Sequence, residues 1–221
     1  MTHDWLLWQL ADSAFPLSGF AHSGGLEAAW QSGEVSSAAA LAGFIESSLD
    51  QSAHGAIPFV TAAHADPRQF AELDRLCDAF LSNHVANRAS RQQGQSLLLA
   101  GERVFASSAL TAFRASVIER NLAGHLAPSF GVVTRLLEFD CPSAVRVFLF
   151  LRLRGLLAGA VRLGLVGPLE AQAIQYRLSP AAEAAAMRGL TLGLDDLAQT
   201  APLLDLWQGT QDRLYSRLFQ S

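Results

Sequence analysis

The chain has 221 residues, of which 50% are hydrophobic and 16% are charged, and its formal net charge is −4. This length fits one domain spanning residues 1–221, and the low charge predicts apolar surface left over for a protein partner. All 16 basic residues are arginines, spread along the chain, which gives no basic field for nucleic acid. The absence of lysine also excludes a phosphate-loop lysine and Schiff-base chemistry.

Alanine and leucine dominate the chain and β-branched residues are few, so we expect an all-α fold. There is no hairpin signal, internal repeat or linker, which favours a single helical bundle of about ten to twelve helices. Proline stands at the first helical position behind a cap in Asp66-Pro67, Gly167-Pro168 and Ser179-Pro180. The expected helices cover 4–14, 25–32, 37–53, 56–64, 67–82, 84–105, 108–123, 128–138, 143–165, 168–177, 180–198 and 202–218.

The first unusual segment is a loop within residues 10–30, LADSAFPLSGFAHSGGLEAAW. We expect a dense, ordered loop whose structural residues are Pro16, Gly19, Gly24 and Gly25. Ser23 or Gly24 is expected to cap the following helix, and Glu27 in its first turn to complement the helix dipole.

Two enzyme interpretations of this loop are weak. Gly19 and Gly24 have phosphate-loop spacing, but Gly25 and Leu26 stand where lysine and serine or threonine are needed. The residues around Ser23 resemble a hydrolase nucleophile elbow, yet no strand precedes them and no histidine follows His125. We therefore expect no enzyme activity, and a serine hydrolase using Ser23 remains the least favoured alternative.

The helix expected at 84–105 carries a polar face formed by Arg88, Arg91, Gln92 and Gln95. Gly94 interrupts this helix at a cost of about 1 kcal/mol relative to alanine. Such a glycine predicts that another segment approaches the helix closely. A solvated arginine face is the ordinary alternative explanation for the polar stripe.

The most apolar segment, 145–166, is long enough to span a bilayer but contains four arginines, at 146, 152, 154 and 162. We interpret it as a buried helix, with no membrane association. Gly155 and Gly159 predict close contact with a neighbouring helix. The arginines need partners, for which Glu138, Asp140 and Glu170 are the nearby candidates.

Metal-site patterns are missing from the sequence. The six histidines form no HxH, HxxxH or HExxH pair, and Cys77 and Cys141 stand alone. We expect no metal site of the chain's own and no cofactor. The polar, acidic start lacks the features of a signal peptide, so the expected compartment is the cytoplasm.

The loop pattern, an Asp, then Phe-Pro, then Gly-Phe-x-His-Ser-x-Gly-Leu-Glu, resembles the N-terminal signature of the urease accessory protein UreF family. The resemblance recurs in RQQG at 91–94, in HLAPSFG at 125–131, in GPLEAQ at 167–172 and in LYSRLF at 214–219. It therefore extends from about residue 6 to residue 221. One departure is Gln211, where many relatives have His.

The resemblance implies a non-catalytic, all-helical maturation factor that dimerises and binds UreD, also called UreH. Through that complex it would recruit the GTPase UreG, so that nickel cations reach apo-urease. It places Phe20 and Arg217 in the region that assembles with partners. The full set of candidate partner-binding residues is Phe20, His22, Ser23, Glu27, Arg91, Tyr215 and Arg217. A helical adaptor for another complex is the main alternative.

The tail from about residue 205 is the expected partner-binding segment. In a helix, Leu214, Tyr215, Leu218 and Phe219 would form one apolar stripe around Arg217. We expect this tail to be mobile in the free protein and to become ordered in the complex. The alternative is a terminal helix docked on its own core.

Overall fold

The computed structural model describes residues 3–17 and 19–221, so the expected loop is described except for Ser18. Its helices are α1 His3–Ala11, η1 Gly19–Ala21, α2 Leu26–Gln31, α3 Ala38–Gly55, α4 Ile57–Ala65, η2 Pro67–Gln69, α5 Phe70–Phe80, α6 His84–Val104, α7 Ser108–Glu119, α8 Leu126–Leu136, α9 Cys141–Arg162, α10 Pro168–Thr191, η3 Leu194–Asp196, α11 Pro202–Thr210 and η4 Gln211–Arg213. The all-α prediction is confirmed, and the described residues contain no strand.

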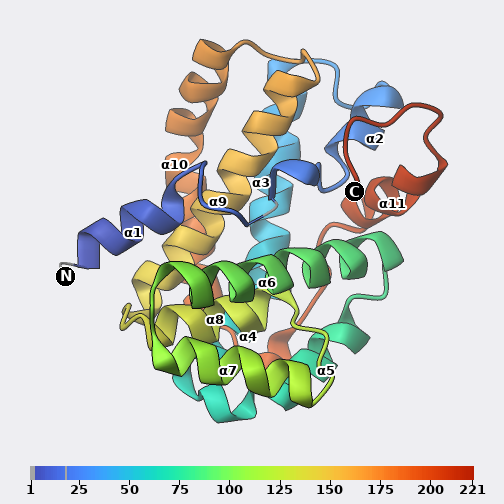
Figure 1. Cartoon of the computed structure of the whole chain (residues 1–221). Coiled ribbons are helices and arrows are strands. Elements are labelled where there is room, and N and C mark those ends of the chain that lie inside the picture. The colour runs from blue at the N-terminus through green and yellow to red at the C-terminus, as the bar shows by residue number, and fades with distance from the viewer. Residues whose placement is uncertain (1–2, 18) are drawn as a thin grey trace.

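The helices form two groups that cross each other (Figure 1). The long helices α3, α9 and α10 run side by side, while α4 to α8 lie across one end of them. One continuous apolar core joins the two groups, with Phe59, Phe130 and Leu156 among its fully buried side chains. The N-terminal loop, α11 and the tail lie together on one flank of this core.

Local capping explains several helix starts that the sequence predicts. Asn83 accepts hydrogen bonds from the backbone N–H groups of Val85 and Ala86 at the start of α6. Asp140 accepts from the N–H of Ser143 at the start of α9. These side chains satisfy backbone donors that have no partner inside the helix. The starts of these helices are therefore fixed by one or two residues each.

The predicted break at Ser179-Pro180 is wrong, because α10 continues through Pro180 to Thr191. Proline removes one helical N–H bond and crowds the carbonyl four residues earlier. Pro180 and Tyr176 both lie on the exposed side of α10, where water can replace the lost partner of that carbonyl. Burial of the opposite face holds the helix together across the proline.

The predicted helix at 202–218 is also wrong in its second half. α11 ends at Thr210, and η4 adds a single turn before the chain becomes extended at Leu214. The proposed apolar stripe therefore does not form. Phe219 is buried while Tyr215 is fully exposed.

The arginines of α9 do not use the expected acidic partners. Arg146 pairs with Glu183 on α10, and the guanidinium of Arg154 donates to the backbone carbonyl of Ala11. The expected close helix contact at the α9 glycines is wrong as well. A Cβ at Gly155 would meet nothing within 4 Å, and the nearest groups to Gly159 are side chains.

The close approach predicted at Gly94 is confirmed. A Cβ on Gly94 would lie 2.7 Å from the backbone carbon of His125 and 2.8 Å from the N of Leu126. The loop before α8 thus rests directly on α6. Gln95 fixes the same loop by donating to the carbonyl of Ala123 at 2.9 Å.

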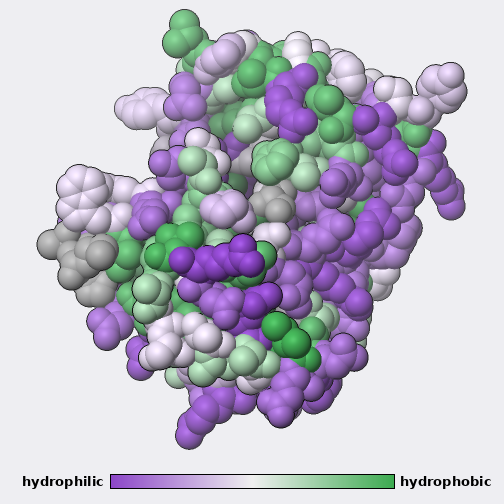
Figure 2. All heavy atoms as spheres, in the orientation of Figure 1, coloured by the Kyte–Doolittle hydropathy of each residue, from purple (hydrophilic) through white to green (hydrophobic). Residues whose placement is uncertain are grey.

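Hydrophilic and apolar side chains are unevenly distributed over the surface. Figure 2 shows hydrophilic side chains over the flank that carries α11, and apolar ones around α1 and the far ends of α9 and α10. Trp5 and Trp8 on α1 are 64% and 57% exposed. Among the described residues, no helix combines the length and apolarity needed to cross a membrane.

Substituting Gly94 should destabilise the fold. Gly94→Ala forces the α6 backbone away from residues 124–126, and we expect it to lower the free energy of unfolding by about 1–3 kcal/mol in urea denaturation. Gly155→Ala is the matched control, because its Cβ meets open space and alanine is the better helix former. Equal stability of the two variants would contradict the close contact.

Candidate functional site

The N-terminal loop is shaped by two glycines with left-handed backbone angles. Gly24 and Gly25 have φ values of 60° and 91°, which disfavour side chains. A Cβ on Gly24 would also lie 2.6 Å from Nη1 of Arg152. Gly25, not Ser23 or Gly24, occupies the cap position of α2, and no side chain caps that helix. The predicted cap is therefore wrong, although the predicted tight turn is confirmed.

Pro16 and Gly19 shape the earlier part of the same loop. Pro16 is exposed between the buried side chains of Phe15 and Leu17, whose backbones are joined by a hydrogen bond of 2.8 Å. Gly19 begins the short helix η1. The loop is thus pinned by side chains on either side of the proline.

The tail lies against this loop. The N–H of Gln220 donates to the carbonyl of Ala21 at 2.8 Å, and the N–H groups of Ser23 and Gly24 donate to the carbonyl of Ser221. His22 Nδ1 lies 2.6 Å from the hydroxyl of Ser221. We expected a tail that becomes ordered only in a complex. In the structure the tail is instead bonded to its own chain. This agrees with the alternative of a docked tail, although the docked segment is not a helix.

A buried carboxylate fixes this arrangement. Glu27 is 1% exposed and accepts hydrogen bonds from the Gln211 amide at 2.6 Å and from the N–H groups of Leu218 and Phe219 at 2.6 and 3.1 Å. Buried carboxylates are tolerated only when donors surround them. Glu27 therefore acts as an anchor for the tail, beyond its expected interaction with the helix dipole. Gln211 supplies the side-chain donor of the anchor.

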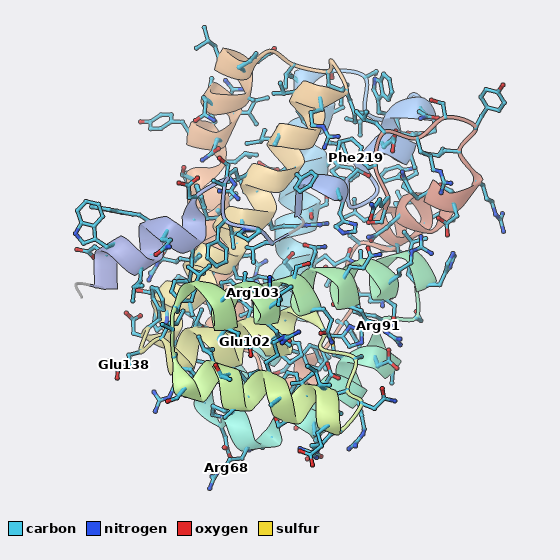
Figure 3. The ribbon with its side chains drawn as sticks, in the orientation of Figure 1. Arg68, Arg91, Glu102, Arg103, Glu138 and Phe219 are labelled. Carbon is cyan, nitrogen blue, oxygen red and sulfur yellow. The ribbon has the colours of Figure 1, made fainter. Side chains whose placement is uncertain are left out.

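Phe219 inserts between the loop and α9. Figure 3 shows its ring beside the N-terminal loop, and Arg162 lies over that ring at 4.3 Å from the centroid. Arg162 also donates to the carbonyl of Phe20 at 2.5 Å. One arginine thus joins α9 to both the tail and the loop by a cation–π contact and a hydrogen bond.

Outside these anchors, several side chains of the loop and tail face solvent. Phe20 is 75% exposed, and Tyr215 and Leu218 are exposed as well. Arg88 binds Asp212 through two nitrogens, at 2.8 and 3.1 Å, and Arg217 reaches the same carboxylate at 3.2 Å. The pKa of Asp212 is lowered, and the hydrogen bonds from Arg88 are the largest cause. Two arginines share one carboxylate, so this surface carries excess positive charge.

A hollow of about 620 Å³ lies between α6 and the tail. Arg88 and Gln92 of α6 line one side, and Asp212 and Arg217 line the other. The exposed loop, the tail and this hollow form what we call the tail surface, made up of Phe20, Arg88, Gln92, Asp212, Tyr215, Arg217 and Leu218.

Arg91 belongs to a different cluster. It points from α6 toward α5, where its guanidinium lies 2.5 Å from Asp78 (Figure 3). Asp78 also accepts from Asn87 and from His125 Nε2, and these contacts lower its pKa to about 2, with Asn87 the largest cause. The backbone N–H of His125 donates to Asp74 at 2.7 Å. Arg91 therefore braces α5, α6 and the loop before α8, away from the tail surface.

The structure places no catalytic partner beside Ser23. Its hydroxyl has no hydrogen-bond partner among the described residues, and it is buried. Those residues also contain no group of three or more His, Cys, Asp or Glu able to hold a metal ion. The sequence does not indicate that Arg88, Asp212 and Arg152 belong to the site. The residues that they contact lie far away along the chain and come close only when it folds.

Removing the charge of Glu27 should release the tail. Glu27→Gln presents an amide N–H₂ to donors that need an acceptor, so we expect a loss of about 1–3 kcal/mol of stability. Trypsin should then cleave faster after Arg213 and Arg217, as measured by intact mass spectrometry. The control Glu34→Gln changes an exposed carboxylate of the same loop region. Unchanged cleavage in Glu27→Gln would contradict the anchor.

Burial of His22 predicts a pH dependence. Desolvation, then the charges of Arg88 and Arg152, lower its pKa from 6.5 to about 4. Between pH 6.5 and 4, His22 is protonated in the unfolded chain but remains neutral in the folded chain. The free energy of unfolding therefore falls as the pH is lowered through this range, by about 3 kcal/mol at most. His64 and His125 act in the same direction. Urea denaturation of His22→Gln should therefore show a shallower decline, and a parallel decline would contradict this assignment.

Comparison with known proteins agrees with the motifs. The UreF family model matches residues 35–179. The urease accessory protein F of Arabidopsis thaliana is 40% identical over 221 residues, covering 98% of this chain and 92% of the relative. The protein of the same name from Oryza sativa subsp. indica is 36% identical, covering 97% and 84%. A UreF-like protein of Schizosaccharomyces pombe is 31% identical, covering 96% and 94%. The chain therefore belongs to the UreF family of urease accessory proteins.

Proposed function

We propose that this protein is a non-catalytic scaffold of urease maturation. In this proposal it binds UreD/UreH, recruits the GTPase UreG and supports nickel insertion into apo-urease, acting in the cytoplasm as a homodimer. The observation that carries the proposal is the tail surface, where Phe20, Tyr215 and Arg217 are exposed on backbone that is anchored internally. Such preorganised aromatic and arginine side chains are typical of interface hot spots.

The candidate partner-binding residues divide into two roles. Phe20, Tyr215 and Arg217 are the exposed ones and are proposed to contact partners. His22, Ser23 and Glu27 are buried, and Arg91 is paired with Asp78. We propose that His22, Ser23 and Glu27 support the contact surface from the interior, while Arg91 braces α5, α6 and the loop before α8.

Nickel enters the proposal as the cargo of the assembled complex. The sequence lacks metal-site motifs, and the described residues contain no group of three or more His, Cys, Asp or Glu able to hold a metal ion. In this proposal the assembled complex as a whole handles the metal. A helical adaptor for another complex would expose a similar surface, and the experiment below separates the two functions.

Arg217→Ala should weaken UreG recruitment while leaving the fold intact. Its exposed pair with Asp212 is worth about 0–1 kcal/mol, so the melting temperature should fall by no more than about 4 °C. Co-purification with UreD and UreG should drop, and so should nickel-dependent urease activation in cells that lack their own factor. Sedimentation of the variant should still show a species larger than 23.7 kDa.

The control is Arg68→Ala, an exposed arginine on the opposite end of the molecule (Figure 3). It should leave urease activation unchanged. Failure of the unmodified chain to activate urease would favour the adaptor function. A large loss of melting temperature in Arg217→Ala would instead show that the residue belongs to the fold.

A further inference from the structure

A cavity of about 330 Å³, partly open to solvent, lies between the N-terminal loop and helices α3, α6, α8, α9 and α11. Much of its wall is apolar, including Phe15, Phe130, Phe148 and Leu156. Polar groups gather in another part of the wall: His22, Ser48, Gln51, Arg152 and Asp205. A cavity of about 150 Å³ accepts benzene, so this one has room for a six-membered ring with a polar substituent.

The charged side chains of this wall are Arg152, Arg154 and Asp205, and Arg152 forms no ion pair among the described residues. Its Nε donates to the hydroxyl of Ser48 at 2.9 Å. Among the described residues, no hydrogen bond or ion pair is made by its two terminal nitrogens. They pack against Gly24, where any Cβ would come within 2.7 Å of both. The guanidinium therefore presents its two-pronged end to the cavity with its donors free.

The other arginines of α9 show that this is unusual. Arg146 has a carboxylate, Arg154 has a backbone carbonyl, and Arg162 has a carbonyl and an aromatic ring. Burial lowers the pKa of Arg152 to about 10, a value at which it still carries its charge at neutral pH. The charge of Asp205 opposes this shift without cancelling it. Because a buried cation is costly, a further anion in the cavity would stabilise Arg152.

Asp205 acts on Arg152 through its charge alone and does not occupy the terminal nitrogens. It forms no ion pair with Arg152 in the described structure; one of its oxygens accepts from Gln51 at 3.1 Å and the other has no partner. Burial raises the pKa of Asp205, while the hydrogen bond from Gln51 and the charge of Arg152 lower it. His22 adds a ring nitrogen, Nε2, that is buried and also without a partner.

We propose that this cavity binds a small monocarboxylate, with the carboxylate on the terminal nitrogens of Arg152 and an apolar body against Phe130, Phe148 and Leu156. The planar fork of an arginine matches the two oxygens of a carboxylate. The apolar wall favours an organic acid over sulfate or phosphate. This ligand lies beyond the proposed role in urease maturation, and neither proposal depends on the other.

Benzoate is the probe, with benzamide as an uncharged molecule of the same shape. Calorimetry and thermal melting of the whole purified chain at constant ionic strength should give benzoate a Kd below about 1 mM and at least tenfold tighter binding than benzamide. Arg152→Met should weaken benzoate binding about tenfold or more. Arg146→Met, on the exposed side of the same helix, should leave it unchanged.

A second variant covers the case in which Arg152→Met does not fold. Gly155 lines the cavity and a Cβ there meets nothing within 4 Å, so Gly155→Leu adds volume to the wall while keeping the guanidinium of Arg152. It should also abolish benzoate binding. Equal binding of benzoate and benzamide, no benzoate binding at all, or full binding in the Gly155→Leu variant would each overturn the proposal and leave a cavity that holds water only.

Discussion

The buried carboxylate of Glu27 holds the two functional segments of the protein together. It lies in the first turn of α2, and its oxygens accept from the amide of Gln211 and from the backbone of the tail. A carboxylate excluded from water is stable only while these donors remain in place. The position of the tail follows from this requirement, and the tail in turn places Phe219 beside the N-terminal loop.

This dependence separates the residues that touch a partner from those that place them. Phe20 and Tyr215 project into solvent from backbone whose neighbours are internally bonded: Ala21 accepts from Gln220, and Glu27 from Leu218. Rigid presentation lowers the entropy lost on binding. Substitutions in the buried anchor would thus impair assembly without any direct contact, which is why stability must be measured beside recruitment.

Local signals in the sequence predict much of the fold. Asp66 caps a helical turn that begins at Pro67, as the sequence predicts, and Gly94 marks a real backbone contact. Pro180 misleads, because tertiary burial of α10 outweighs its local preference for a helix start. The tail misleads for the same kind of reason. Its helical periodicity loses to hydrogen bonds with Glu27, a residue almost two hundred positions earlier that no local pattern connects to it.

The site is less predictable than the fold, because its charged side chains pair with residues that are far away in the sequence. The four arginines of α9 look alike in the sequence, yet three of them find a carboxylate, a carbonyl or an aromatic ring, and Arg152 finds one hydroxyl. A lysine in this position could lose its proton on burial, whereas a guanidinium keeps its charge. The charge of Arg152 must therefore be met inside the cavity, either by water or by an anion. Water can meet this charge beside the polar groups of the wall. A carboxylate can bind both terminal nitrogens and also place an apolar body against Phe130, Phe148 and Leu156, which is the physical reason that it is the better match.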